Sequence, residues 1–315
     1  MKILDFDFIQ KLNIKPLQCY KWVEEMLINK ERVILPPKIS MKMENHSFYN
    51  VMPCIIHESN VMGVKVIARL PSRTGDLPGL TSQIMLYDLK SGNLLALIDG
   101  NYITAMRTGS VAAHSLKLLA KEDFETIGIV GLGITAVATF EILTQLFPHR
   151  KMQVKLYRYK EQAEQFMDRF KKNTNISFSI VDTTENVICD SDVIISCVTY
   201  AEKNLANDSC YKEGCTVIPV HTMGFQNCDL SFDKVFGDDT GHISGFKYFE
   251  RFRKFAEVSD VVLGRTAGRE NEQERILVYN IGVAMHDVYL ASKIYQAAPD
   301  APEVSLSQPQ KKMWL

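Results

Sequence analysis

Residues 131–136, Gly-Leu-Gly-Ile-Thr-Ala, have the residue types and spacing that predict chemistry most directly in this sequence. They follow a short β-branched run at 126–130 and precede apolar residues at helical spacing. In such an order of strand, turn and helix, Gly131 allows a tight turn, Gly133 leaves room for a pyrophosphate, and the small Ala136 lets the helix pack on the strand. The helix N-terminus then faces the anion. We predict a dinucleotide site, with an ordinary tight turn as the alternative.

Arg107 is a second candidate for binding an anion. The small and apolar residues at 109–120 predict a buried helix. We expect Thr104 to cap it, which places Arg107 in the first turn, where a cation is unfavourable against the helix dipole. The arginine then needs an anion nearby. The sequence is equally compatible with a bound ligand and with a surface carboxylate.

The end of the second predicted strand bears on the choice of cofactor. An NAD-binding fold carries Asp or Glu about 20 residues after the glycines, to bind the ribose hydroxyls. This strand ends instead in Tyr157-Arg158-Tyr159-Lys160. Arg158 and Lys160 would pair with a 2′-phosphate, and Arg158 or Tyr159 would stack on adenine. We therefore expect NADP(H), with NAD(H) as the alternative because these side chains also suit a plain surface.

The elements that position these residues fall into two groups. Strands and helices alternate after residue 119, which predicts a Rossmann-type doubly wound α/β domain. Its strands are expected at 126–130, 152–157, 176–181, 193–199, 217–221 and 234–237, with a helix at 160–172. The earlier part predicts an α+β unit with a helix at 14–31, strands at 47–52 and 62–70, and a hairpin of 84–88 with 94–98. A helix at 282–295 precedes an expected loose tail.

Composition excludes several classes of protein. The 315 residues have a net charge of −1 and no basic stripe for nucleic acid. No apolar run approaches the ~20 residues that span a membrane, and the first residues lack the pattern of a signal peptide, so we expect a cytoplasmic protein. The seven cysteines form no Cys-x-x-Cys pair and the histidines are scattered. We therefore expect neither a disulfide framework nor a metal site.

A series of short motifs resembles the ornithine cyclodeaminase and mu-crystallin family from about residue 36 to 291. The motifs are Met52-Pro53, Gly63-Val64-Lys65, Leu70-Pro71, Ser91-Gly92-Asn93, Met106-Arg107-Thr108, the glycine turn, Gly268-Arg269-Glu270, Gly282 and Asp287. The resemblance implies a Rossmann domain at 119–289. It also implies a substrate-binding and dimerisation domain built from both chain ends, 1–118 with 290–315, and a homodimer. The implied reaction moves a hydride between a nicotinamide and the α-carbon of an amino or imino acid.

The resemblance also implies roles for individual residues. Lys65 and Arg107 would be catalytic, with Arg107 clamping the substrate carboxylate and Lys65 hydrogen-bonding it or relaying a proton. On its own, Lys65 would be expected to be an exposed strand lysine. Lys38 and Met223 would also line the substrate. A strand-end histidine such as His221 is more often structural, but it joins the expected cofactor-binding residues: Thr81, Arg107, Thr108, Gly131, Gly133, Ile134, Thr135, Ala136, Arg158, Thr199, His221 and Gly282.

Two positions depart from the family's pattern. Ornithine cyclodeaminases carry an aspartate and a glutamate where this chain has Met223 and Asn50. Cyclising ornithine requires its distal amine to be delivered in neutral form, and a thioether cannot assist. Asp229 would substitute only after a loop shift. We therefore expect an NAD(P)-dependent ketimine reductase or amino acid dehydrogenase. The alternatives are ornithine cyclodeaminase, which forms proline and ammonia, and a non-enzymatic NADP-dependent ligand-binding protein.

Overall fold

The computed structural model describes residues 1–71 and 79–306. Contacts between residues divide the chain into two compact units. Unit 1 comprises Met1–Ile14, Glu31–Ile103 and Asp287–Leu315, and unit 2 comprises Lys15–Lys30 and Thr104–His286. These limits differ from the expected domain limits because residues 15–30 and 104–118 pack with unit 2 and residues 287–289 with unit 1. The assignment of substrate binding and dimerisation to one domain stays a prediction.

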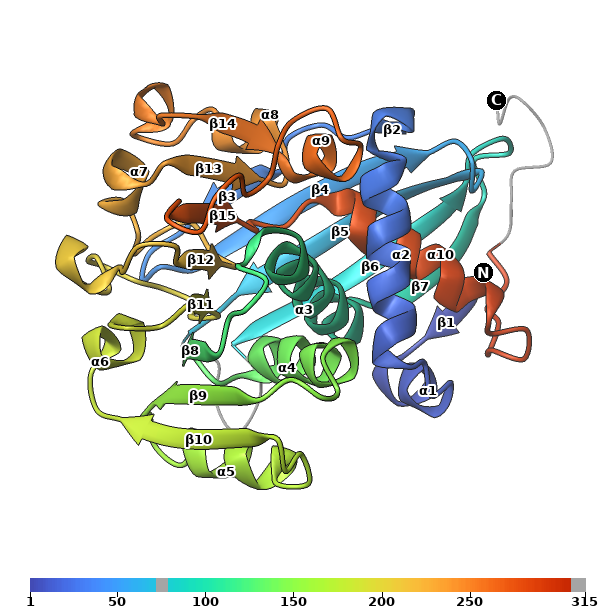
Figure 1. The fold of residues 1–315 in the computed structure, drawn as a ribbon. Helices are drawn as coiled ribbons and strands as arrows, with labels where there is room; N and C mark the ends of the chain where they lie inside the picture. Colours follow the sequence, from blue (N-terminus) through green and yellow to red (C-terminus); the bar gives the residue numbers. More distant parts are fainter. Residues whose placement is uncertain (72–78, 307–315) are drawn as a thin grey trace. The chain divides into compact units, whose positions relative to one another are not determined.

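Unit 2 is built on an eight-stranded parallel sheet (Figure 1) in the order β10-β9-β8-β11-β12-β15-β13-β14. The order reverses at β8, because β9 and β10 extend the sheet on one side and β11 and β12 on the other, so the predicted Rossmann-type fold is confirmed. The strands are β8 (Thr126–Val130), β9 (Met152–Tyr157), β10 (Ile176–Val181), β11 (Val193–Ser196), β12 (Thr216–Pro219), β13 (Lys234–Gly237), β14 (Phe255–Glu257) and β15 (Ile276–Tyr279).

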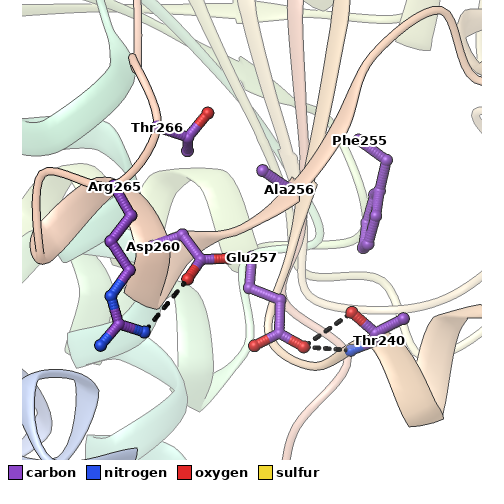
Figure 2. Close-up of a pocket in the computed structure, with 7 residues that line it drawn as sticks. All are labelled: Thr240, Phe255, Ala256, Glu257, Asp260, Arg265 and Thr266. Carbon is purple, nitrogen blue, oxygen red and sulfur yellow. Dashed lines mark hydrogen bonds and ion pairs between the residues drawn. The ribbon is translucent and has the colours of Figure 1, made fainter.

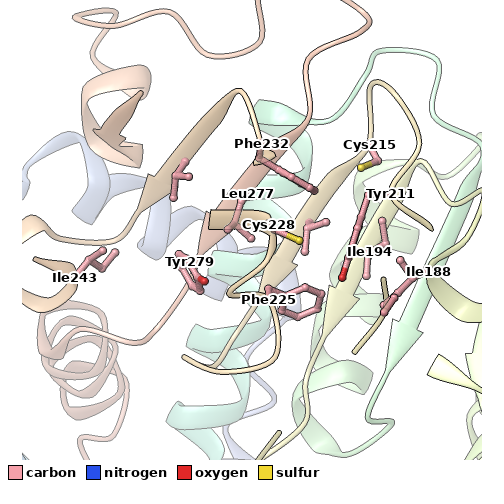
Figure 3. Packing of buried hydrophobic residues seen from close by; sticks show 13 residues of the cluster. Ile188, Ile194, Tyr211, Cys215, Phe225, Cys228, Phe232, Ile243, Leu277 and Tyr279 are labelled. Atoms are coloured by element: carbon pink, nitrogen blue, oxygen red, sulfur yellow. The ribbon is translucent and has the colours of Figure 1, made fainter. Parts of the chain in front are cut away.

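Helices and an apolar cluster hold this sheet. The helices are α2 (Pro16–Ile28), α4 (Ile134–Leu146), α5 (Gln162–Phe170), α6 (Thr184–Ile188), α7 (Cys228–Ser231), α8 (Thr240–Ile243) and α9 (Val258–Val262), with 3-10 turns η2 (Asp208–Cys210) and η3 (Phe249–Arg251). Figure 3 shows the buried cluster, to which β11, β12, β13 and β15 each contribute together with α6, α7 and α8. Its packing fixes the strands whose carboxyl ends carry the polar residues described below.

Unit 1 contains a seven-stranded sheet in which β1 pairs parallel to β7 and the other pairs are antiparallel. The order is β1-β7-β6-β5-β4-β2, and β3 also pairs with β4. The predicted hairpin is confirmed as β6 and β7. The elements are β1 (Lys2–Leu4), α1 (Phe6–Lys11), η1 (Lys30–Arg32), β2 (Val33–Ile34), β3 (Ile39–Lys42), β4 (Phe48–Ile56), β5 (Val61–Arg69), β6 (Leu80–Asp88) and β7 (Leu94–Asp99).

Two of the boundaries between the units fall inside α-helices, α3 (Gly100–Leu119) and α10 (Ala284–Gln296). The expected cap at Thr104 is wrong, since α3 already begins at Gly100. The carboxylate of Asp99 accepts the backbone N–H of Asn101 at 2.9 Å and so satisfies a donor at the true helix start. Arg107 therefore lies well inside the helix, and the argument from an unfavourable first-turn cation does not apply.

The segment after α10 is ordered by the first strand, so the expectation of a loose tail is wrong for residues 297–304. The backbones of Met1 and Val304 exchange two hydrogen bonds of 2.8 Å. Ile3 N donates to Pro302 O at 2.8 Å, and Ala298 is buried. The rest of the expected tail, 307–315, lies outside the described residues.

Candidate active site

The predicted glycine turn lies where the strand order of unit 2 reverses. Gly131 follows β8 with a φ of 80°, a left-handed conformation that glycine adopts without penalty. A Cβ atom at this position would lie 2.8 Å from the carbonyl carbon of Cys197 and 2.8 Å from the backbone nitrogen of Val198, directly after β11. The turn therefore lies against the segment that leaves β11. Open α/β sheets bind ligands at this switch point, beyond the carboxyl ends of the strands.

The start of α4 has the properties of an anion site. Gly133 is the N-cap residue of α4 and has no side chain. The first N–H groups of the helix therefore have no side-chain acceptor from the N-cap residue. No heavy atom lies within 4 Å of the position that a Cβ on Gly133 would take. Ile134 is exposed and Thr135 half-buried, whereas Ala136 is buried. This open cradle of uncapped N–H groups fits the pyrophosphate of a dinucleotide.

His221 lies just beyond β12 and contacts the last residue of β11. Its Nε2 is 2.6 Å from Ser196 Oγ. Burial lowers the pKa of His221 to about 4, so the imidazole is neutral at pH 7. Its Nδ1 is buried, and a backbone interaction with Met223 acts against the lowering of its pKa. Thr199 lies exposed on the segment after β11. The strand ends therefore offer neutral polar groups, one of which is suited to a ligand.

Arg107 belongs to a buried cluster at the carboxyl ends of β13 and β15. The carboxylate of Asp238, just after β13, accepts Gly282 N at 2.9 Å and Asn280 Nδ2 at 3.2 Å. A Cβ on Gly282, whose φ is 82°, would lie 2.8 Å from Arg107 Nη1, so the guanidinium packs directly on this backbone. Burial raises the pKa of Asp238, and the positive charge of Arg107 acts against that rise. Thr108, also a predicted cofactor residue, is buried beside Arg107 in α3.

Sequence reasoning missed two members of this cluster. Asp238 directly follows a strand that was correctly predicted, so the rule that ligands bind at carboxyl ends would have singled it out. Asn280 follows β15, whose four buried residues were not recognised as a strand. Its Oδ1 is buried without a hydrogen-bond partner in the described part of the chain. A missed central strand therefore hid the residues at its end.

Arg158, expected at the adenosine end, lies on the surface at the end of β9. Its Nε pairs with Asp182 Oδ1 at 2.8 Å and its Nη1 with Glu164 Oε1 at 2.9 Å. Lys160 lies over the ring of Tyr159. A 2′-phosphate at this place would therefore compete with two carboxylates for the guanidinium.

In unit 1, Lys65 occupies the buried face of β5 because side chains alternate between the two faces of a strand. The expectation of an exposed strand lysine is wrong, since Lys65 is 0% exposed and its Nζ lies 2.7 Å from Asp287 Oδ1. Thr81 on β6 and Lys38, between β2 and β3, are both half-buried. Asn50 Oδ1 on β4 is buried, with no hydrogen-bond partner in the described chain.

Asp229 is not a substitute for the acid that is absent at the exposed Met223. It is buried in α7, and its Oδ1 accepts the hydroxyl of Tyr279, a member of the core cluster, at 2.8 Å. Burial raises the pKa of Asp229 from 3.8 to about 6. The carboxyl group is therefore part of the core of unit 2, and the supposed loop shift would have to break this packing.

Asp229→Asn is expected to stabilise the protein at pH 8 by roughly 2 kcal/mol and not at pH 4. Below its ordinary pKa of 3.8 the carboxyl is protonated in both states. Between 3.8 and about 6 the unfolded chain loses its proton first, so stability falls as pH rises. An amide keeps an acceptor for Tyr279 and removes this pH dependence. Urea unfolding at pH 4 and at pH 8 measures the free energy of unfolding, and exposed Asp168→Asn serves as the control. If Asp229→Asn and wild type differed in this free energy by the same amount at both pH values, the prediction would be contradicted.

A separate hollow of about 550 Å³ lies in unit 2 and holds none of the predicted site residues (Figure 2). Glu257 in its wall accepts the backbone N–H and the hydroxyl of Thr240, both at 2.7 Å. Asp260 faces Arg265 at 3.8 Å. Its charged groups thus pair with protein groups, so the carboxyl ends of the strands remain the better candidate. The lining residues are Thr240, Phe255, Ala256, Glu257, Asp260, Arg265 and Thr266.

In residues 1–71 and 79–306, the His, Cys, Asp and Glu side chains form no group of three or more placed to hold a metal ion. None of the helices described is both long and apolar enough to span a bilayer.

The parallel sheet, its glycine turn and the uncapped helix define a Rossmann-type protein. More specifically, the chain belongs to the ornithine cyclodeaminase/mu-crystallin family, whose model matches residues 6–301.

Three relatives indicate the range of this family. The chain is 28% identical to the nodulation efficiency protein NfeD of Rhizobium meliloti over 271 residues, 84% of each protein. It is 25% identical to a Δ1-pyrroline-2-carboxylate reductase of Bacillus thuringiensis over 288 residues, 86% of this chain and 88% of the relative. The Thermococcus litoralis Δ1-pyrroline-2-carboxylate reductase, solved with NADH and L-proline, superposes with a TM-score of 0.82 at 25% identity, covering 95% of this chain and 97% of that chain.

Proposed function

We propose that this protein is an NAD(P)-dependent reductase of a cyclic or linear α-imino acid, or a dehydrogenase of the matching amino acid. The observation that carries the proposal is the buried guanidinium of Arg107 against Gly282, in the same unit as the glycine turn. An arginine at a strand-end site suits a carboxylate, which every α-imino acid carries. Similarity to two Δ1-pyrroline-2-carboxylate reductases supports the same class.

The residues of unit 2 would hold the dinucleotide in the following way. The backbone of the glycine turn and the first N–H groups of α4 bind the pyrophosphate, including those of Ile134 and Thr135. The nicotinamide, when bound, supplies or accepts the hydride. Neutral His221 offers a hydrogen bond without placing a second charge nearby. Thr108, Thr199 and Gly282 complete the cofactor set proposed in unit 2, and Thr81 of unit 1 is proposed in addition.

The proposed substrate residues are mostly cationic. Arg107 orients the carboxylate through two parallel hydrogen bonds, which holds the C=N carbon in one direction for reduction. Lys65 and Lys38 supply further donors. Met223 offers an apolar thioether where the cyclodeaminase pattern has an acid, so a substrate without a distal amine is favoured. Ornithine cyclodeaminase is the second candidate and an NADP-dependent ligand-binding protein the third.

Oxidation of NADPH, with NADH in parallel, tests the proposal when the purified protein is given Δ1-pyrroline-2-carboxylate or pyruvate with methylamine. Turnover with either imino acid is the expected result. Release of ammonia from ornithine without net change of the cofactor would favour the cyclodeaminase instead. Nucleotide binding without any turnover would favour the ligand-binding protein.

The proposed preference for NADP(H) predicts a specific effect of Arg158→Leu. The KM for NADPH should rise roughly tenfold, the value of one charged hydrogen bond, while the KM for NADH stays unchanged. The matched control is Arg169→Leu, since Arg169 is also an exposed arginine paired with a glutamate. Equal KM values for NADPH in wild type and Arg158→Leu would remove Arg158 from the cofactor site.

We also propose a homodimer that uses an apolar face of unit 1. Ile39 and Met41 lie on one face of β3 and are 60% and 48% exposed. Their cross-strand partners on β4 are Val51 and the exposed Tyr49, so the apolar face continues onto the next strand. A contiguous exposed apolar face is typical of an interface. Light scattering should give twice 35.8 kDa, and Met41→Asp should halve that mass, whereas the exposed Val304→Asp should not.

A further inference from the structure

Lys65 and Asp287 form an ion pair that is closed to solvent. Their Nζ and Oδ1 atoms are 2.7 Å apart, and both side chains are 0% exposed. A buried charge that loses its partner destabilises a fold strongly, whereas an apolar pair of similar volume is often as stable as the ion pair. Packing alone therefore gives no reason for two charges at this place.

The glycine at position 63 on β5 allows the two charges to come together, because it has no side chain. Gly63 and Lys65 lie on the same buried face of the strand. A Cβ on Gly63 would lie 2.6 Å from Val288 Cγ2 and 2.8 Å from its Cγ1, which is closer than real atoms approach. Helix α10 thus packs on the bare backbone of Gly63. Since Val288 follows Asp287, the same close approach carries the carboxylate to Lys65.

The cross-strand neighbours of Lys65 and Gly63 on β4 and those of Lys65 on β6 are uncharged. Cys54 lies opposite Gly63 on β4, while Met52 and Ile84 are the cross-strand partners of Lys65. Burial, with the negative charge of Asp287 as the second cause, raises the pKa of the Cys54 thiol to about 12. The thiol therefore stays neutral, so it does not compete with Asp287 as an anion for the ammonium.

We propose that Asp287 is a positioning residue that holds Lys65 as a protonated ammonium in one fixed direction. Lys65 then meets the substrate carboxylate as a permanent cation and hydrogen-bond donor, and it does not relay the proton to the substrate nitrogen. The pair thereby selects a substrate with a negative charge next to its C=N carbon. This inference rests on the proposed function only in that Lys65 is taken to bind the substrate.

The charge of Lys65 is measured directly by 15N NMR of lysine-labelled protein, with Lys65→Met to assign its Nζ signal. Wild type should show the ammonium form at neutral and mildly alkaline pH, and Asp287→Asn the neutral amine. This readout needs no substrate, so it decides the role of Asp287 even if no imino acid is turned over. An ammonium signal that is unchanged in Asp287→Asn would overturn the proposal.

Kinetics give the second readout. Asp287→Asn should lower kcat/KM for the imino acid roughly 100-fold, as expected for a lost charged contact, while the Kd for nucleotide stays unchanged. Asp287→Glu should restore part of this loss because it restores the charge. Unchanged kcat/KM in Asp287→Asn, or no rescue by Asp287→Glu, would overturn the proposal.

Removing both charges distinguishes a purely structural role of the ion pair from the proposed positioning role. The double variant Lys65→Met with Asp287→Leu should unfold within a few degrees of wild type and have no activity. A large loss of Tm in the double variant would show that the fold requires the pair and would overturn a role in positioning. If Asp287→Asn does not fold, the Nζ signal of Asp287→Glu decides: an ammonium supports the proposal and a neutral amine overturns it.

Discussion

Arg107→Lys should reduce kcat/KM for the imino acid roughly 100-fold while nucleotide affinity and Tm stay near their wild-type values. Lysine keeps the positive charge near the buried carboxylate of Asp238, so the fold does not gain an unpaired charge. It loses the planar fork that packs on Gly282 and binds a carboxylate through two hydrogen bonds. Most of the loss should appear in kcat, because a carboxylate held by one bond no longer fixes the C=N carbon.

Arg107→Leu extends this result. It removes the charge as well, so kcat/KM should fall a further tenfold or more, and the protein should lose stability because Asp238 stays buried. Steady-state kinetics with Δ1-pyrroline-2-carboxylate, nucleotide titration and thermal unfolding measure the three quantities. Arg169→Leu is the control on the exposed surface. Wild-type kinetics in Arg107→Lys would show that the guanidinium does not clamp the substrate.

Strands with a clear local residue pattern could be predicted from the sequence. The strands at 126–130, 152–157, 176–181 and 234–237 have the predicted bounds. The first is rich in β-branched residues, whereas those at 152–157 and 176–181 alternate apolar and polar residues, the period of a strand. The start of α3 was misplaced because Gly100 and Asn101 are weak helix formers. In the structure, the carboxylate of Asp99 accepts a backbone N–H of the first helical turn. A local hydrogen bond from backbone to side chain thus outweighed intrinsic propensity.

The candidate site was accessible only in part, for a topological reason. The glycine turn is a contiguous motif, so its residues are visible without knowledge of the strand order. The ion pair of Lys65 and Asp287 joins residues 222 positions apart, and no local period indicates that they meet. Asp238 could be reached because it follows a predicted strand, whereas Asn280 becomes a candidate only once β15 is recognised as the strand beside β13. Sequence periodicity therefore does not predict buried polar pairs between elements that are distant in the chain.

Gly133→Ala and Gly131→Ala should separate binding of the dinucleotide from formation of the turn. Gly133 has open space at its Cβ position and no positive φ, so alanine there should lower stability by at most about 1 kcal/mol, the loss expected at an N-cap. The added methyl group occupies the space proposed for the pyrophosphate. The Kd for NADPH or NADH should therefore rise 100-fold or more, with Tm of the free protein nearly unchanged.

Gly131→Ala should damage both properties. A residue with a Cβ loses about 1–2 kcal/mol in the left-handed conformation, and this Cβ would also lie 2.8 Å from backbone atoms of Cys197 and Val198. The free protein should therefore melt several degrees lower and bind nucleotide poorly. Gly245→Ala, with open space around it and no positive φ, is the control for both measurements. If the pyrophosphate binds at this turn, the methyl group of Gly133→Ala must exclude it. Normal nucleotide affinity in Gly133→Ala would therefore show that the glycine turn is an ordinary turn of the sheet.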